Sequence, residues 1–308
     1  MRISSKWLAV AGLLLATGWP QHAGAQLTPA AIRATLRGQS HAFVQLPGSG
    51  QIMLVGTITI HTAAEFKREL AADRSIHTLI VDSNGGWSDS AMDMAALIRE
   101  RKMRLVVDGR CLSACANYLF PAAVTRSVLP GSIVAIHGAS FVYMDGEQVK
   151  MAPHSQAEGL SHLPSVRSQR EDLKRTAARE AAFYQQLGLH RDTDVTFAHY
   201  LAHRKRLLGT DMIQGEQRAP GCPPVQMWAM DKAQWEAAGV RGIDKFWFPV
   251  NAEQQKQVSR DLGLPAEFFY FGDAAGLEAL CTQAPSLRVR MERWLGTVKT
   301  AVASVVTR

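Results

Sequence analysis

Residues 104–123, RLVVDGRCLSACANYLFPAA, place a serine between a buried strand and a helix. The run RLVVDG (104–109) has an apolar centre, which is typical of a strand covered on both faces. Residues 113–123 predict a short helix that ends around Pro121, because proline cannot continue a helix. Ser113 therefore lies where helical N–H groups favour negative charge. It is either a nucleophile or an N-cap hydroxyl in a cysteine-flanked piece of core.

Strands and helices alternate around this junction. Further strands are predicted at 50–60, 76–83 and 132–138, and helices at 62–73, with Thr62 as N-cap, and at 89–102. This alternation predicts an α/β fold with right-handed crossovers.

The C-terminal half is more irregular. A loop rich in Gly, Pro, His and Ser is predicted at 139–164, and a long polar helix at 165–188. A helix with Gly239 as its C-cap is predicted at 230–240, and residues 250–308 are expected to be helical with a break at 262–273.

The N-terminus predicts a secretory signal peptide. Arg2 and Lys6 lie beside an uncharged apolar run at 7–19, and AGA at 23–25 is a small-residue cleavage pattern. The apolar run is short for a membrane span, although a retained anchor is the alternative. We therefore expect a mature chain from Gln26 that is periplasmic or secreted. The expected organisation is a signal peptide (1–25), a lead-in segment (26–49), a main domain (50–248) and a C-terminal helical extension (249–308).

Four cysteines remain after this cleavage: Cys111, Cys115, Cys222 and Cys281. An even number in an exported chain permits two disulfides, and the sequence does not choose among the three pairings. Buried free thiols are the alternative. The cysteines lack the paired short spacings of a structural zinc site, so no metal site is predicted.

The formal net charge of +7 includes two charges in the signal peptide. The basic cluster HRKRLL (203–208) has no interleaved aromatic residues and no nucleic-acid motif. We interpret it as a solvated face or a weak contact for anions, and we predict no nucleic-acid partner.

Three chemically useful elements follow successive predicted strands. DSNGG (82–86) ends one strand with two glycines, whose backbone can approach a ligand closely. Ser113 follows the next strand, and His137 lies at the end of the strand SIVAI. A neutral imidazole could accept the serine proton, and backbone N–H groups could stabilise an oxyanion. Each element alone is more often structural, and only their order and context point to chemistry.

The region 50–140 resembles the proteolytic subunit of the Clp protease, in the ClpP/crotonase superfamily. LIVDSNGGWSDSAMDMAALI (79–98) is similar to that family's strand, SPGG turn and helix. CLSACANYLF (111–120) stands where the family has its nucleophile, and SVLPGSIVAIHGA (127–139) is similar to the segment with its catalytic histidine. AQWEAAGVRGID (233–244) resembles a late helix and turn of the family.

The resemblance implies a fold of repeated β-β-α units with a projecting handle-type helix at 165–188. It implies a serine hydrolase with Ser113 as nucleophile, His137 as general base and the N–H groups of Gly86 and Ala114 as the oxyanion hole. The expected activity is that of an ATP-independent peptidase without a cofactor. The substrate would be a peptide or protein, and homo-oligomers are expected because family members form rings.

The sequence also departs from the family's pattern. The position of the triad aspartate is occupied by Met227, and the nearby acids Asp192, Asp194, Asp211 and Asp231 do not match, so the third acid is unassigned. The segments that dock an ATPase are not recognisable, and no ATPase partner is expected. The alternative function is an inactive protein that binds a peptide or protein in the same groove. A Ser–Lys site with Lys150 or Lys174 ranks lower, and an acyl-CoA enzyme lower still.

Overall fold

The computed structural model describes residues 41–46, 48–137, 140–146, 148–153, 157–189 and 225–279. The signal peptide, Cys222, Cys281 and the basic cluster at 203–208 lie outside these residues, so the predictions about them stay predictions.

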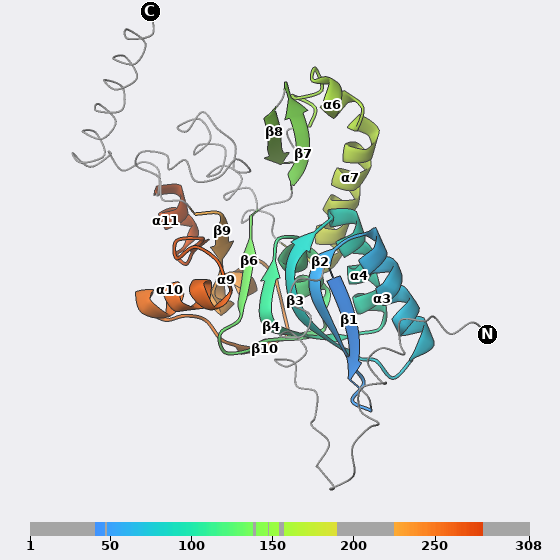
Figure 1. The fold of residues 1–308 in the computed structure, drawn as a ribbon, viewed down its shortest axis with the longest axis vertical. Coiled ribbons are helices and arrows are strands. Elements are labelled where there is room, and N and C mark those ends of the chain that lie inside the picture. The colour runs from blue at the N-terminus through green and yellow to red at the C-terminus, as the bar shows by residue number, and fades with distance from the viewer. Residues whose placement is uncertain are drawn as a thin grey trace, which may run out of the picture.

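A nine-stranded mixed sheet forms the centre of the described molecule (Figure 1). Its main path runs β1–β2–β3–β4–β6–β9–β11. Off this path, β5 pairs with β4 and β10 pairs with β5. The pairs β2–β3, β3–β4 and β4–β6 are parallel, whereas β1 and β9 join as antiparallel strands. The strands are β1 (His41–Leu46), β2 (Gln51–Ile58), β3 (Thr78–Gly86), β4 (Arg104–Leu112), β5 (Thr125–Val128), β6 (Ile133–Ile136), β9 (Met227–Ala229), β10 (Ile243–Phe246) and β11 (Phe269–Tyr270).

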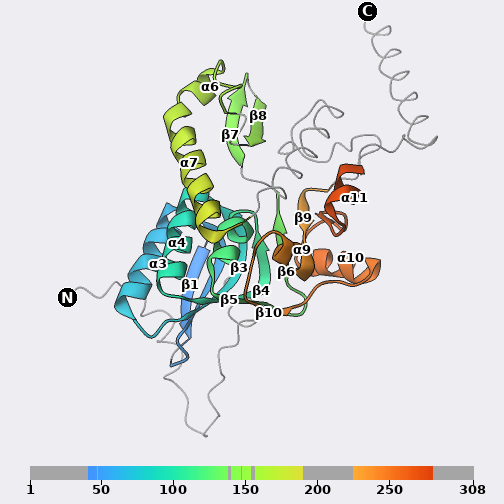
Figure 2. The same ribbon diagram turned by 180° about the vertical axis from the view of Figure 1, so that it is seen from behind.

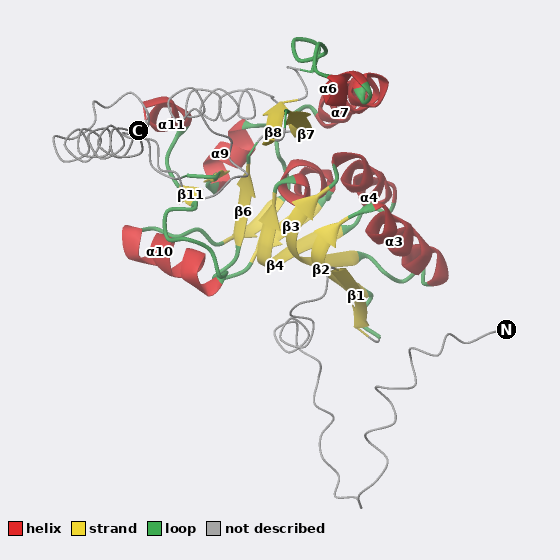
Figure 3. Ribbon diagram, turned by 45° about the horizontal axis from the view of Figure 1, so that its top comes forward, coloured by secondary structure: helices red, strands yellow, loops and turns green. Residues whose placement is uncertain are grey.

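Helices α3 (Ile60–Ala72) and α4 (Ser88–Glu100) lie side by side along one face of this sheet (Figure 3). The apolar side chains of Phe66 and Met94 are fully buried between the helices and the strands. Because β3 is covered, its apolar residues are buried on both faces, as its continuous apolar run predicts. The remaining helices are the π-helix η1 (Cys115–Leu119), α5 (Phe120–Ala122), α6 (Pro164–Arg167), α7 (Arg170–Leu187), α9 (Lys232–Ala237), α10 (Ala252–Asp261) and α11 (Ala274–Ala279).

The predicted mixed α/β fold with a central sheet is confirmed. The prediction of a loop at 139–164 was wrong. This segment contains the antiparallel hairpin of β7 (Ser140–Asp145) and β8 (Gln148–Pro153), in which Phe141 and Tyr143 are buried against the start of α6. The alternating pattern of the hairpin was masked by the turn-forming residues around it.

The predicted N-cap of α3 was also wrong. The helix begins at Ile60, and the side chain of Thr59 accepts a hydrogen bond from the backbone N–H of Thr62. Thr62 is itself buried, and its hydroxyl donates to the carbonyl oxygen of Thr57. Thr62 thus ties the first turn of the helix to the end of β2.

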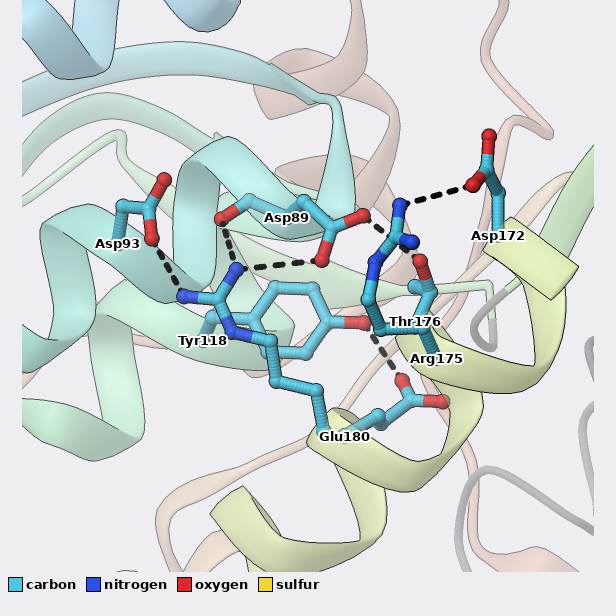
Figure 4. A network of polar contacts seen from close by, with 8 residues as sticks. Asp89, Asp93, Tyr118, Asp172, Arg175, Thr176 and Glu180 are labelled. Carbon is cyan, nitrogen blue, oxygen red and sulfur yellow. Dashed lines mark hydrogen bonds and ion pairs between the residues drawn. The ribbon is translucent and has the colours of Figure 1, made fainter.

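Helix α7 rises from the body and carries α6 and the hairpin at its far end (Figures 1 and 2). Thr176 Oγ1 donates to Asp89 Oδ2 over 2.7 Å, and Tyr118 Oη donates to Glu180 Oε1 over 2.5 Å (Figure 4). Arg179 pairs with carboxylates of α4, among them Asp89. Burial lowers the pKa of Arg179, but its hydrogen bonds and acidic neighbours outweigh burial and raise that pKa. The near end of α7 is therefore fixed against α4 and η1.

Among the described helices, none has both the length and the apolar character needed to span a bilayer.

Candidate active site

Ser113 occupies a tight junction between β4 and η1. Its φ of 54° lies in the left-handed region, which residues other than glycine seldom adopt. Its N–H donates to the carbonyl oxygen of Ala135 over 3.0 Å, and its carbonyl oxygen accepts from the N–H of Asn117 over 2.8 Å. The backbone is therefore held on both sides of the hydroxyl, which is the kind of over-determined geometry found at functional sites.

Ser113 and His137 lie within hydrogen-bond distance of each other. Strands β4 and β6 are parallel with Leu112 opposite Ala135, so the residues that follow both strands emerge at the same sheet edge. The distance between Ser113 Oγ and His137 Nε2 is 2.6 Å. The structure thus brings together the two side chains that the sequence singles out.

The glycine turn at the end of β3 packs directly against Ser113. Gly85 has a φ of 87°, and a Cβ atom added there would lie 2.4 Å from the carbonyl oxygen of Leu112 and 2.7 Å from Ser113 Cβ. The N–H of Gly85 donates to Ser83 Oγ over 3.1 Å. Sequence reasoning missed the packing role of Gly85, although paired glycines after a buried strand signal a close backbone approach.

The two predicted oxyanion donors are the residues that follow the contact between Gly85 and Ser113: Gly86 follows Gly85, and Ala114 follows Ser113. The N–H groups next to Gly86 are both used within the protein, since Gly85 donates to Ser83 and Trp87 donates to the carbonyl oxygen of Ile58 over 2.9 Å. Gly86 itself is exposed and can meet a ligand.

Ala114 caps the start of η1, where the first N–H groups have no acceptor within the helix. Its nitrogen lies 2.8 Å from the position of a Cβ atom added at Gly85. The backbone of the nucleophile turn therefore lies directly against the glycine turn.

A disulfide between Cys111 and Cys115 encloses Ser113. Both cysteines are fully buried in the main core, whereas Ser113 is only half-buried. The bridge thus lies beneath the serine and leaves the contact with His137 intact. This resolves one pairing that the sequence left open and excludes buried free thiols at these two positions.

Removing the disulfide is expected to destabilise the protein. In the chain-entropy account a loop this short contributes about 2 kcal/mol to the free energy of unfolding. The double variant Cys111→Ala/Cys115→Ala should therefore unfold at lower urea concentration with an unchanged m-value, measured by circular dichroism. A midpoint equal to that of the wild type would show that the bridge does not constrain the turn.

The position predicted for the triad acid is beside His137 but holds a thioether. Strand β9 is antiparallel to β6, with Ile136 opposite Trp228, and continuing that register places Met227 opposite His137. Asp231 caps α9 by accepting from the N–H of Gln234 over 2.8 Å. Asp192, Asp194 and Asp211 lie outside the described residues.

The lysines considered for a Ser–Lys site lie on other elements. Lys150 belongs to β8 of the hairpin, and Lys174 pairs with Glu171 on α7 over 3.7 Å. Within the described parts of the chain, no group of three or more His, Cys, Asp or Glu residues could hold a metal ion.

Comparisons with known proteins give distant structural matches. No protein-family model matches the chain. No curated protein sequence matches it. One match is a serine-to-alanine mutant of the 1510-N membrane-bound stomatin-specific protease, at 13% identity and a TM-score of 0.35, covering 72% of this chain and 95% of that one. A lysine-to-alanine mutant of that protease in complex with a substrate peptide matches at 14% identity and a TM-score of 0.35, covering 79% and 94%.

An enoyl-CoA hydratase from Bacillus anthracis also matches, at 8% identity and a TM-score of 0.27, covering 32% of this chain and 51% of that one. The parallel strands β2, β3, β4 and β6, with the glycine turn and the serine at their carboxyl ends, have the arrangement that the quoted motifs predict. The chain thus has a mixed α/β fold in which the glycine turn and Ser113 lie at the carboxyl ends of neighbouring parallel strands.

Proposed function

We propose that the protein is an exported serine hydrolase, specifically a peptidase that works without ATP. The observation that carries this proposal is the 2.6 Å contact between Ser113 Oγ and His137 Nε2, beside the glycine turn. An N-cap serine would bond to its own helix, whereas this hydroxyl faces an imidazole from another strand.

In the proposed reaction, His137 Nε2 accepts the proton of Ser113 Oγ while that oxygen attacks the carbonyl carbon of a peptide. For this role the imidazole has to carry its own proton on Nδ1. The N–H groups of Gly86 and Ala114 donate to the developing oxyanion. His137 then returns the proton to the leaving amine, and water releases the acyl group by the same route.

Export, substrate class and assembly belong to the same proposal. The signal-peptide pattern and the Cys111–Cys115 disulfide support a periplasmic or secreted protein, because disulfides persist in oxidising compartments. We propose peptides or proteins as substrates and a homo-oligomeric assembly, both on the strength of the family resemblance.

One observation favours a second function. Met227 stands where an acid would orient His137, and a methionine sulfur accepts hydrogen bonds only weakly. A protein with this substitution could hold a peptide in the groove without cleaving it.

A fluorophosphonate probe distinguishes the two functions. The purified mature protein should be labelled, and Ser113→Ala should not be labelled, because the probe reacts only with an activated serine. His137→Ala should label at least about a hundredfold more slowly, since general-base catalysis contributes on that order.

The matched control is Ser75→Ala, which removes an exposed hydroxyl on the loop after α3 and should label like the wild type. Absence of labelling in wild-type protein that melts cooperatively would reject the hydrolase and favour the binding protein.

A further inference from the structure

A second pocket lies away from the candidate active site. Its volume is about 260 Å³, and it lies between the end of α4, the α5–β5 connection and the segment after α9. Much of its wall is apolar and includes Leu187, Leu189 and Val240. Its other feature is positive charge from Arg99, Arg126 and Arg241, and none of the described residues that line it is acidic.

Arg126 is an unusual residue in this wall, because it is only 3% exposed. One of its nitrogens, Nη2, donates to the carbonyl oxygens of Pro121 and Ala123, and its guanidinium lies 5.7 Å from the ring centroid of Phe120. Its Nε and Nη1 atoms are buried without a hydrogen-bond partner. Burial lowers the pKa of Arg126 to about 10, so the side chain stays charged at neutral pH.

A buried cation of this kind is unfavourable unless an anion accompanies it. Within the described residues, no carboxylate forms an ion pair with Arg126. The guanidinium belongs to a residue in the wall of the pocket, so an anion bound there would offset its charge. The pocket therefore contains an uncompensated charge next to apolar walls.

Arg126 lies far from Ser113 along the sheet. Arg126 lies at the start of β5, opposite Leu105 near the start of β4, whereas Ser113 follows the end of β4. Along β4, eight residues separate Leu105, which is opposite Arg126, from Ser113, and this corresponds to on the order of 25 Å. A ligand in this pocket would not touch the candidate nucleophile.

We propose that this pocket binds a carboxylate attached to a small apolar body. Arg126 and Arg241 would neutralise the carboxylate, and Leu187, Leu189 and Val240 would contact the apolar part. Inorganic phosphate fits less well, because it would leave the apolar walls uncovered and lose its own hydration. Two sources share this chemistry, a short fatty acid and the C-terminal carboxylate of a peptide.

Calorimetric titration of the mature protein tests the proposal. Hexanoate and acetyl-leucine should bind, whereas hexanol and acetyl-leucine amide, which lack the charge, should bind at least about tenfold more weakly. Tighter binding of acetyl-leucine than of hexanoate would identify peptide C-termini as the source, and the reverse order would identify fatty acids.

Variants of the lining arginines complete the test. Arg126→Met and Arg241→Gln should each lower the affinity for hexanoate and acetyl-leucine about tenfold and leave the affinity for hexanol unchanged. Arg68→Gln, on the surface of α3 and outside the pocket, is the matched control and should bind like the wild type. If Arg126→Met does not fold, the Arg241→Gln result decides.

Equal binding of carboxylate and uncharged analogue, unchanged affinity in the folded arginine variants, or no binding at millimolar concentration would each overturn the proposal.

Discussion

The Ser113→Ala variant is expected to hydrolyse a p-nitrophenyl ester or fluorescent casein at least about a thousandfold more slowly than the wild type. The loss is large because no other group replaces the attacking oxygen, while the backbone donors and the substrate groove remain. His137→Ala should reduce the rate similarly, since the serine proton then has no acceptor at 2.6 Å.

The double variant Ser113→Ala/His137→Ala should lose no more hydrolytic activity than the less active single variant, because the effects of substituting residues that act as a unit are strongly non-additive. This comparison separates a working pair from two independent structural contacts. Losses that multiply in the double variant, or a Ser113→Ala protein with wild-type turnover, would contradict the proposed nucleophile.

The Gly85→Ala variant is expected to lose both stability and labelling by fluorophosphonate. The added methyl group would lie 2.4 Å from the carbonyl oxygen of Leu112 and 2.7 Å from Ser113 Cβ, and both neighbours belong to the nucleophile turn. The turn must move or the helix after it must shift. Together with the positive φ, this should lower the free energy of unfolding by about 3 kcal/mol or more, measured by urea titration.

Gly131→Ala is the matched control for this substitution. Gly131 has a φ of 77°, but nothing lies within 4 Å of an added Cβ atom. We therefore expect only the cost of a positive φ for a residue with a Cβ atom, which is about 1 kcal/mol. It should label like the wild type. A Gly85→Ala protein that melts like Gly131→Ala and labels normally would show that the glycine turn does not position the serine.

The strands with continuous apolar runs were predictable from the sequence, because burial on both faces leaves a simple composition signal. The short strands β1, β5, β9 and β11 were not predicted. Each is six residues or fewer, and β9 and β11 pair through only two positions, so tertiary pairing rather than local sequence defines them.

The pairing of Ser113 with His137 was an expectation from their order along the chain and from the family resemblance. The structure accounts for their proximity, because the carboxyl ends of parallel strands share one edge. The π-helical winding of η1 was not predicted. This helix begins at the disulfide-bonded Cys115 and is buried along its whole length, and neither property is visible in the local periodicity of the sequence. The burial of Arg126 was not predictable either, because burial depends on the residues that fold around the side chain and not on the local sequence TRSV.

The left-handed backbone at Ser113 has a consequence for the evolution and engineering of this chain. Glycine or asparagine would adopt a φ of 54° at a lower free-energy cost than serine, by about 1 kcal/mol in the case of glycine. Selection for stability alone would therefore favour exchanging this serine and would remove the hydroxyl from the site. A stabilised version that retains the proposed nucleophile has to keep serine at position 113 and gain its stability elsewhere.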